Sequence, residues 1–258
     1  IISGVYNGYT TGAPISIMFL NENTRSSDYS QFAAIPRPGH ADFTSSQKYK
    51  GYTDPRGGGH FSGRVTLGLV AAGVIAKKII SPVVIQAILI EAGGSTDIST
   101  AVEKAMESED SIGGIISCMA TNMPVGLGEP FFDSVEAVLA HGLFSIPAIK
   151  GVEFGAGFEA AKMSGSEHND PIVSADGKTA TNNAGGINGG ITNGNDLLFK
   201  VAVKPTSSIG KPQQTFNVKT EKVEILKVEG RHDACIAVRM PVIVEAITAI
   251  TLADFTLL

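Results

Sequence analysis

Four segments of the sequence are rich in glycine or hydroxyl residues and contain side chains that can bind anions or transfer protons. Glycine and asparagine in series can direct several backbone N–H groups at an anion, and a lysine with neighbouring hydroxyls adds a charge and more donors. None of the segments matches a P-loop or a GxGxxG motif, and each alone would pass for a surface turn. Together they predict local anion sites, in RPGHAD (Arg37 to Asp42), DPRGGGHFSGRVT (Asp54 to Thr66), NNAGGINGGITNGN (Asn182 to Asn195) and KPTSS (Lys204 to Ser208).

The segment with three consecutive glycines stands directly before a predicted helix that begins at Arg64. Ser62 and Gly63 are therefore candidate cap residues for that helix. A helix N-terminus has a partial positive charge and unpaired N–H donors, which suit a phosphate group. The alternative is a flexible turn, but the bulky Phe61 within the segment argues against it.

Two histidines stand between an arginine and an aspartate, where an imidazole could exchange protons near neutral pH. His40 lies between Arg37 and Asp42, and His232 lies in GRHDAC beside Asp233. The other two histidines outside the glycine segments have simpler interpretations: His141 as a packed residue of an apolar helix and His168 as a solvated loop residue. No pair has the spacing of a zinc site, so no metal is expected.

The elements that must position these residues alternate between strand and helix patterns, which is typical of one mixed α/β layered domain over residues 1–258. The patterns predict strands at Pro14–Leu20, Val83–Gly94, Ile112–Ala120, Gly151–Phe154, Leu197–Val203 and Glu221–Val228. They predict helices at Arg64–Ile80, Ser99–Met106, Ser134–Phe144 and Val242–Leu258. The polar stretch 164–194 is expected to be a long functional loop.

The composition excludes some classes of function. A net charge of −5 argues against a non-specific nucleic-acid binder. No apolar run reaches the length of about 18 residues that a membrane span needs, so a soluble protein is expected. Cys118 and Cys235 lie far apart in apolar surroundings, which favours reduced core thiols and a cytoplasmic location.

The motifs, taken in order, resemble those of the chorismate synthase family over nearly the whole chain. The matching text is RPGHADFT at Arg37, GGGHFSGRVT at Gly57, GLGEPFFDSVEAVLAHGLFSIPAIKGVEFGAGF at Gly126, NNAGGINGGITNG at Asn182, VAVKPTSSI at Val201 and GRHDACIAVRMPVIVEA at Gly230. The resemblance implies a β-α-β sandwich (an α/β or α+β fold) that assembles into homotetramers. It also implies a lyase that converts 5-enolpyruvylshikimate 3-phosphate to chorismate with reduced FMN, which some relatives reduce with NADPH.

The resemblance assigns roles to individual positions. His40 and Asp233 match the family's proton-transferring residues, which act on the flavin, while Arg37 and Arg64 match residues expected to face the phosphorylated substrate. The positions that match flavin-contacting residues are His60, Phe61, Ser62, Ala148, Gly189, Lys204, Pro205, Thr206, Ser207, Ser208 and Arg231.

The sequence departs from the family pattern in two places. Many members read GGRSSARET where this chain reads GGHFSGRVT, which keeps Ser62, Arg64 and Thr66. The family's amino-terminal motif with a first active-site histidine has no counterpart, so the chain is expected to lack that portion of the domain. The alternative function is therefore an inactive fragment that binds FMN or phosphate. A nicotinamide oxidoreductase on a Rossmann sheet is disfavoured because GxGxxG is missing.

Overall fold

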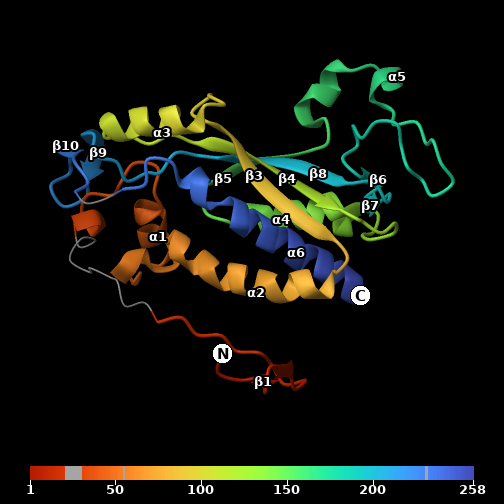
Figure 1. The fold of residues 1–258 in the computed structure, drawn as a ribbon. Helices are drawn as coiled ribbons and strands as arrows, with labels where there is room; N and C mark the ends of the chain where they lie inside the picture. The colour runs from red at the N-terminus through yellow and green to blue at the C-terminus, as the bar shows by residue number, and fades with distance from the viewer. Residues whose placement is uncertain (21–30, 55, 230–231) are drawn as a thin grey trace.

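A four-stranded antiparallel sheet organises the chain in the computed structural model, which describes residues 1–20, 31–54, 56–229 and 232–258 (Figure 1). Its strand order is β3-β4-β8-β5, and every neighbouring pair is antiparallel. The strands are β3 (Val84–Ala92), β4 (Gly114–Thr121), β5 (Ile149–Phe154) and β8 (Leu197–Val203). A Rossmann sheet is parallel, so this topology agrees with rejecting the nicotinamide-enzyme alternative.

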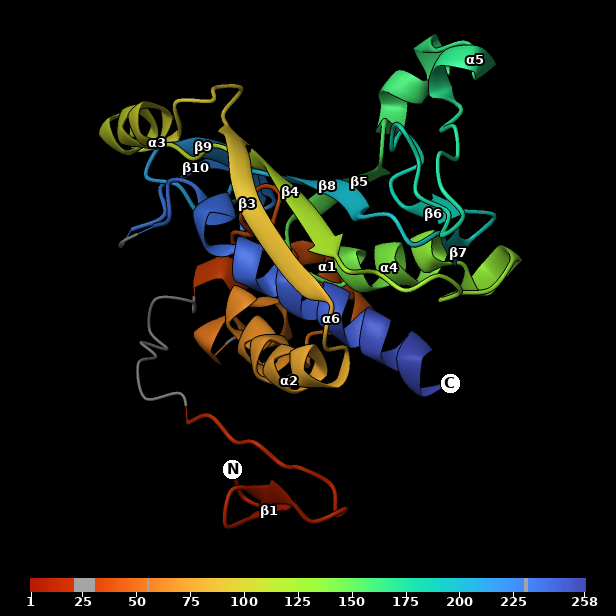
Figure 2. The same ribbon diagram turned by 45° about the vertical axis from the view of Figure 1, so that its right-hand side comes forward.

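Three long helices form a layer on one face of this sheet (Figures 1 and 2). Helix α6 packs against β3 and β4, α4 packs against β5, and α2 lies against α6 on the side away from the sheet. These helices are α2 (Thr66–Ile79), α4 (Val135–Phe144) and α6 (Pro241–Leu257). Burial alternates along β8, as expected for a sheet with one covered face.

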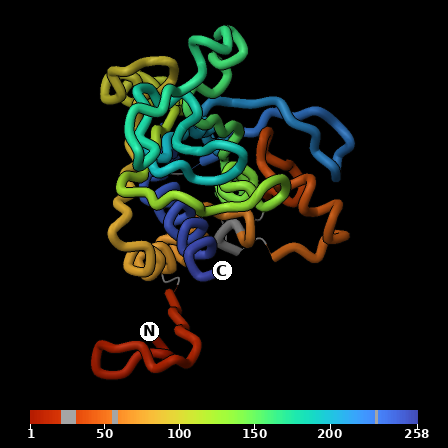
Figure 3. Tube along the Cα trace, turned by 90° about the vertical axis from the view of Figure 1, so that its right-hand side faces the viewer, coloured from red at the N-terminus to blue at the C-terminus, as the bar shows by residue number. Residues whose placement is uncertain are grey.

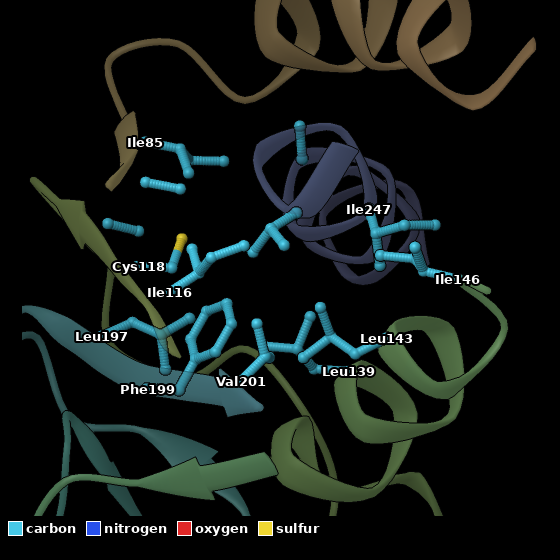
Figure 4. Close-up of a cluster of buried hydrophobic side chains, with 14 of the residues drawn as sticks. Ile85, Ile116, Cys118, Leu139, Leu143, Ile146, Leu197, Phe199, Val201 and Ile247 are labelled. Carbon is cyan, nitrogen blue, oxygen red and sulfur yellow. The ribbon is translucent and has the colours of Figure 1, made fainter. Parts of the chain in front are cut away.

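The hydrophobic core lies between the sheet and the helix layer. Figure 4 shows Ile116, Phe199 and Val201 of the sheet directed toward Leu139 and Leu143 of α4. All five side chains are buried. The core therefore fixes the ends of β4 and β8, from which the loops described below emerge.

Glu245 of α6 joins the helix layer to the edge strand β3. Its carboxylate accepts a hydrogen bond from the backbone N–H of Ala87 (2.9 Å) and pairs with Lys77 Nζ of α2 (2.5 Å). The Glu245 side chain is mostly buried, so this carboxylate satisfies an N–H that would otherwise face the apolar layer.

Replacing Glu245 with alanine is expected to lower the free energy of unfolding by about 2–3 kcal/mol, because a charged hydrogen bond and a paired backbone donor are both lost. Urea unfolding measures this change. Glu103→Ala, on the exposed face of α3 (Ile98–Glu107), is the matched control and should change stability by less than about 0.5 kcal/mol. Equal losses in the two variants would show that Glu245 has no linking role.

Shorter elements surround this core. Two hairpins lie in the second half of the chain, β6–β7 (Ile187–Asn188, Ile191–Thr192) and β9–β10 (Gln213–Asn217, Lys222–Leu226). The short helices are α1 (Asp42–Lys48), η2 (Arg56–Phe61), η3 (Gly63–Val65), η4 (Phe131–Asp133), η5 (Gly157–Lys162), α5 (Gly165–His168) and η6 (Ile236–Arg239). The hairpin β9–β10 lies beside the segment that precedes α1, because Thr215 Oγ1 donates to the Pro36 carbonyl (2.7 Å).

The prediction of a buried strand at Pro14–Leu20 was wrong. Residues 1–20 form the small hairpin β1–β2 (Val5–Tyr6, Tyr9–Thr10) and an extended segment that lies apart from the rest of the chain (Figure 3). Met18 and Leu20 are 61% and 70% exposed. An apolar run indicates a tendency to be buried, but it becomes a sheet strand only where a partner strand supplies hydrogen bonds.

The other strand and helix predictions agree with the structure within a few residues, and the mixed α/β fold is confirmed. The stretch 164–194, expected to be a loop, also contains α5 and the hairpin β6–β7. Within the described ranges, no helix combines the length and hydropathy needed to cross a membrane. The same ranges contain no cluster of side chains suited to hold a metal ion.

Candidate active site

Arg37 and Asp42 form a buried ion pair at the start of α1. The guanidinium donates from Nε to Oδ2 and from Nη2 to Oδ1, both at 2.8 Å, so the contact is bidentate. Arg37 is only 8% exposed, and its guanidinium lies over the ring of Phe32 at 4.2 Å from the ring centroid. This pair fixes the turn that carries the RPGHAD segment.

His40 lies within the same turn and is oriented by Asp42. Its Nδ1 is 2.6 Å from Asp42 Oδ1. A carboxylate in this position favours a proton on Nδ1. Arg37 Nη2 lies 3.2 Å from Nε2, so a ligand must replace this contact before Nε2 can exchange a proton with it. Gly39 precedes it with φ of +69°, a conformation that glycine adopts without strain.

The electrostatics of this cluster keep Asp42 ionised. Burial opposes ionisation of its carboxyl group, but hydrogen bonds from Arg37 and His40 outweigh that effect and hold the pKa of Asp42 well below its usual range. The carboxylate therefore remains a fixed negative charge beside His40 at neutral pH.

A carboxyl group with a lower pKa in the folded state than in the unfolded state adds stability at pH values above its unfolded pKa of about 4. That contribution is lost as pH falls below about 4 toward the folded-state pKa. Asp42→Asn should therefore show a shallower loss of stability with acid than the unmodified chain. Urea unfolding between about pH 6 and pH 3 measures the slopes, with exposed Asp254→Asn as the control. Identical slopes in all three proteins would contradict the assignment.

The KPTSS segment follows β8 and contacts the RPGHAD segment directly. Lys204 Nζ donates to the Gly39 carbonyl at 3.0 Å, and Ser207 Oγ donates to the same carbonyl at 2.8 Å. Arg37 Nη1 donates to Ser208 Oγ at 3.0 Å. Two of the four glycine-containing or hydroxyl-rich segments therefore meet at one place, although they are far apart in the sequence.

A small cavity of about 110 Å³ opens beside this cluster. Arg37, His40 and Asp42 line one side of it, and Phe61 from the end of η2 lines another. Gly59 in η2 has φ of +55°, and a side chain at this position would collide with the Asp54 carbonyl. The glycine here permits close backbone approach, so this part of the glycine run is a packed turn.

Ser62 caps the short helix η3, which leads into α2. Its Oγ accepts a hydrogen bond from the Arg64 backbone N–H at 3.2 Å, as the sequence predicts for a cap residue. The exposed side chain of Arg64 follows directly. The cap thus fixes the DPRGGGHFSGRVT segment directly after Phe61, which lines the cavity.

The comparisons with known proteins identify the family. The chorismate synthase family model matches residues 1–257. The chain belongs to the chorismate synthase family. It is 61% identical to a chorismate synthase from Chitinophaga pinensis over all of this chain and 78% of that protein, and 46% identical to one from Korarchaeum cryptofilum over 98% and 79%. A crystal structure of chorismate synthase covers 84% of this chain and 70% of its own, with a TM-score of 0.67 and 27% identity.

The chain therefore belongs to a family of lyases, and the function predicted from the ordered motifs is confirmed at that level. The comparisons give no support to the alternative of an inactive binding fragment. The chain also shares its fold with the crystal structure of chorismate synthase.

The geometry brings together most of the residues carried over from the family. Ala148, with φ of +76°, accepts the backbone N–H of Lys204 through its carbonyl at 2.9 Å, so it lies beside the KPTSS segment. Thr206 is part of the KPTSS segment, and its carbonyl accepts a hydrogen bond from Ser111 Oγ at 2.7 Å. Pro205 packs near Gly113, while the side chain of His60 is exposed at the end of η2.

Two predicted site residues lie apart from this cluster. Asp233 forms an ion pair with Arg239 Nη2 at 2.8 Å, and its side chain is 41% exposed. Gly189 lies in the turn of β6–β7, which Figures 1 and 3 place apart from α1. Arg231 lies outside the described residues. The candidate His232 is held by the Val228 carbonyl (3.1 Å), which occupies its Nε2.

Two residues of the site were missed in the sequence. Phe32 stands at the end of a polar stretch, and only its contact with Arg37 reveals its role. Lys150 follows Ala148 by two residues and had no motif of its own, although a cation so close to a predicted contact was a usable signal.

Proposed function

We propose that the chain catalyses the anti 1,4-elimination of phosphate from 5-enolpyruvylshikimate 3-phosphate to give chorismate, with reduced FMN as cofactor. The observation that carries the proposal is the meeting of the Arg37–His40–Asp42 cluster with the KPTSS segment. The cluster offers an oriented imidazole, and the segment offers an ammonium and hydroxyl groups. An elimination of phosphate with loss of a proton needs both kinds of group in one site.

The residues present suit a phosphorylated flavin. Thr206 Oγ1 is buried and has no hydrogen-bond partner among the described residues, although its neighbours in the KPTSS segment are bonded. A buried hydroxyl without a partner is costly unless a ligand or water completes it. When bound, reduced FMN would supply electron density that assists cleavage of the allylic C–O bond.

The side chains have distinct roles in this proposal. His40 transfers a proton at Nε2 once a ligand replaces the contact of that atom with Arg37 Nη2 (3.2 Å), while Asp42 holds the ring through Nδ1. Arg37 and Arg64 face the substrate phosphate, and Asp233 accepts a proton at a carboxylate oxygen. The proposed flavin contacts are the positions that match the family's flavin-contacting residues: His60, Phe61, Ser62, Ala148, Gly189, Lys204, Pro205, Thr206, Ser207, Ser208 and Arg231.

We also propose a cytoplasmic homotetramer without nucleic-acid or membrane partners. An apolar groove of about 550 Å³ between α2, α4 and α6 supports association, because it exposes Ile75, Ile79 and Leu257 among others. We further propose NADPH as the reductant of the flavin, which is tested by replacing dithionite with NADPH in the assay below.

An anaerobic assay with dithionite-reduced FMN tests the proposed reaction. We expect the reduced flavin to give phosphate and chorismate in equal amounts. We expect no product when the flavin is left oxidised. Unchanged substrate, with flavin bound as shown by titration, would contradict the proposal and favour the binding-only alternative.

A further inference from the structure

Lys150 is the extra residue of a β-bulge beside the KPTSS segment. Ile149 pairs with Val203 and Gly151 pairs with Ala202, so the register shifts by one residue at Lys150. A bulge leaves one residue out of the ladder and re-aims its side chain, and bulges are common next to active sites. The bulge therefore frees Lys150 from the regular alternation of β5 at the point where β8 ends.

The backbone places Lys150 beside the start of the KPTSS segment, because the Lys204 N–H donates to the Ala148 carbonyl at 2.9 Å, two residues before Lys150. Burial and the neighbouring charge of Lys150 together lower the pKa of Lys204. Lys204 Nζ donates only to uncharged partners, the Gly39 carbonyl and Ser207 Oγ. In the described part of the chain, neither lysine forms an ion pair with a carboxylate, whereas Lys200 on the same strand as Val203 pairs with Glu153 at 3.1 Å.

Two adjacent cations without an acidic partner repel each other, and that repulsion is relieved when an anion binds between them. The hydroxyl groups of the KPTSS segment support the interpretation of this place as an anion site. Ser207 Oγ is bonded to Lys204 at 3.0 Å, and the unpartnered Thr206 Oγ1 lies one residue away along the same segment. The site thus combines two positive charges with hydroxyl donors, which is the chemistry that recognises a phosphate monoester.

We propose that Lys150 is a phosphate-binding residue, which the bulge in β5 positions to share one phosphate monoester with Lys204. The inference rests on the proposed function, since both FMN and the substrate carry such a group. Lys150 lies two residues after Ala148 in the matching segment that begins at Gly126, but the resemblance assigned no role to Lys150 itself, so this assignment comes from the register and the charges.

Flavin titration of Lys150→Gln tests the proposal. At low ionic strength the variant should bind oxidised FMN about tenfold more weakly than the unmodified chain, because a charge-assisted contact is lost. The difference should shrink as salt is added. Riboflavin, which has the same ring system without phosphate, should bind equally to both proteins. Lys162→Gln, on exposed η5, removes the same charge and should bind FMN normally. Lys150→Arg should retain most of the affinity.

The substrate provides the second arm of the experiment. A tenfold loss of affinity for 5-enolpyruvylshikimate 3-phosphate with unchanged FMN binding assigns the phosphate to the substrate and supports the proposal. Affinities for both ligands within twofold of the unmodified chain overturn it. Inorganic phosphate separates this outcome from failure of the proposed function: even without flavin binding, phosphate should raise the unfolding temperature of the unmodified chain more than that of Lys150→Gln, and equal shifts would also overturn the inference.

Discussion

Replacing His40 with alanine is expected to lower turnover by about 100-fold or more, because a positioned general acid or base contributes at least that factor. The imidazole is oriented by Asp42 at 2.6 Å and lines the cavity, so no other described histidine can take its place. Steady-state release of phosphate under anaerobic conditions measures the effect.

The control for this variant is His141→Ala, which removes a histidine that lines the groove between α2, α4 and α6. It should retain most of the turnover. Flavin titration of both variants separates a loss of chemistry from a loss of binding. Turnover of His40→Ala within threefold of the unmodified chain would exclude proton transfer by His40.

Replacing Arg37 with methionine is expected to lower the free energy of unfolding by about 3–5 kcal/mol. The substitution leaves the Asp42 carboxylate buried without its bidentate partner, and an unpaired buried charge is strongly destabilising. Urea unfolding at neutral pH measures this loss. Arg239→Met, which breaks the exposed pair with Asp233, is the matched control and should cost at most about 1 kcal/mol.

A double variant shows whether the loss arises from the pair itself. Arg37→Met combined with Asp42→Asn removes both charges, so it should be more stable than the sum of the two single losses predicts. Strict additivity of the two losses would mean that Arg37 stabilises the chain through packing on Phe32 rather than through Asp42.

The sheet and the helix layer could be predicted from the sequence because their burial patterns are local. Leu197–Val203 is a run of seven residues that is apolar except for Lys200, and the observed strand has the same bounds. The run at Pro14–Leu20 has an equally strong apolar signal, but a strand also needs hydrogen-bonding partners. Such partners are a property of the whole fold, so the apolar run alone misled the prediction.

The site residues could be predicted one by one, but their arrangement could not. The contact between Gly39 and Lys204 joins positions 165 residues apart, and no spacing rule connects them. The bulge at Lys150 likewise depends on how β5 pairs with β8. The contacts of Asp233 could not be predicted either: its proposed proton transfer comes from the family resemblance, and only the fold shows its ion pair with Arg239.

The central claim is that the Arg37–His40–Asp42 cluster and the KPTSS segment form one flavin and substrate site. A crystal structure of the chain with oxidised FMN and 5-enolpyruvylshikimate 3-phosphate tests it most directly. We expect the flavin to lie against Phe61, Ser62 and the KPTSS segment, with His40 Nε2 within hydrogen-bond reach of a ligand. Well-defined density for both ligands elsewhere, with His40 more than about 6 Å from either, would contradict the account.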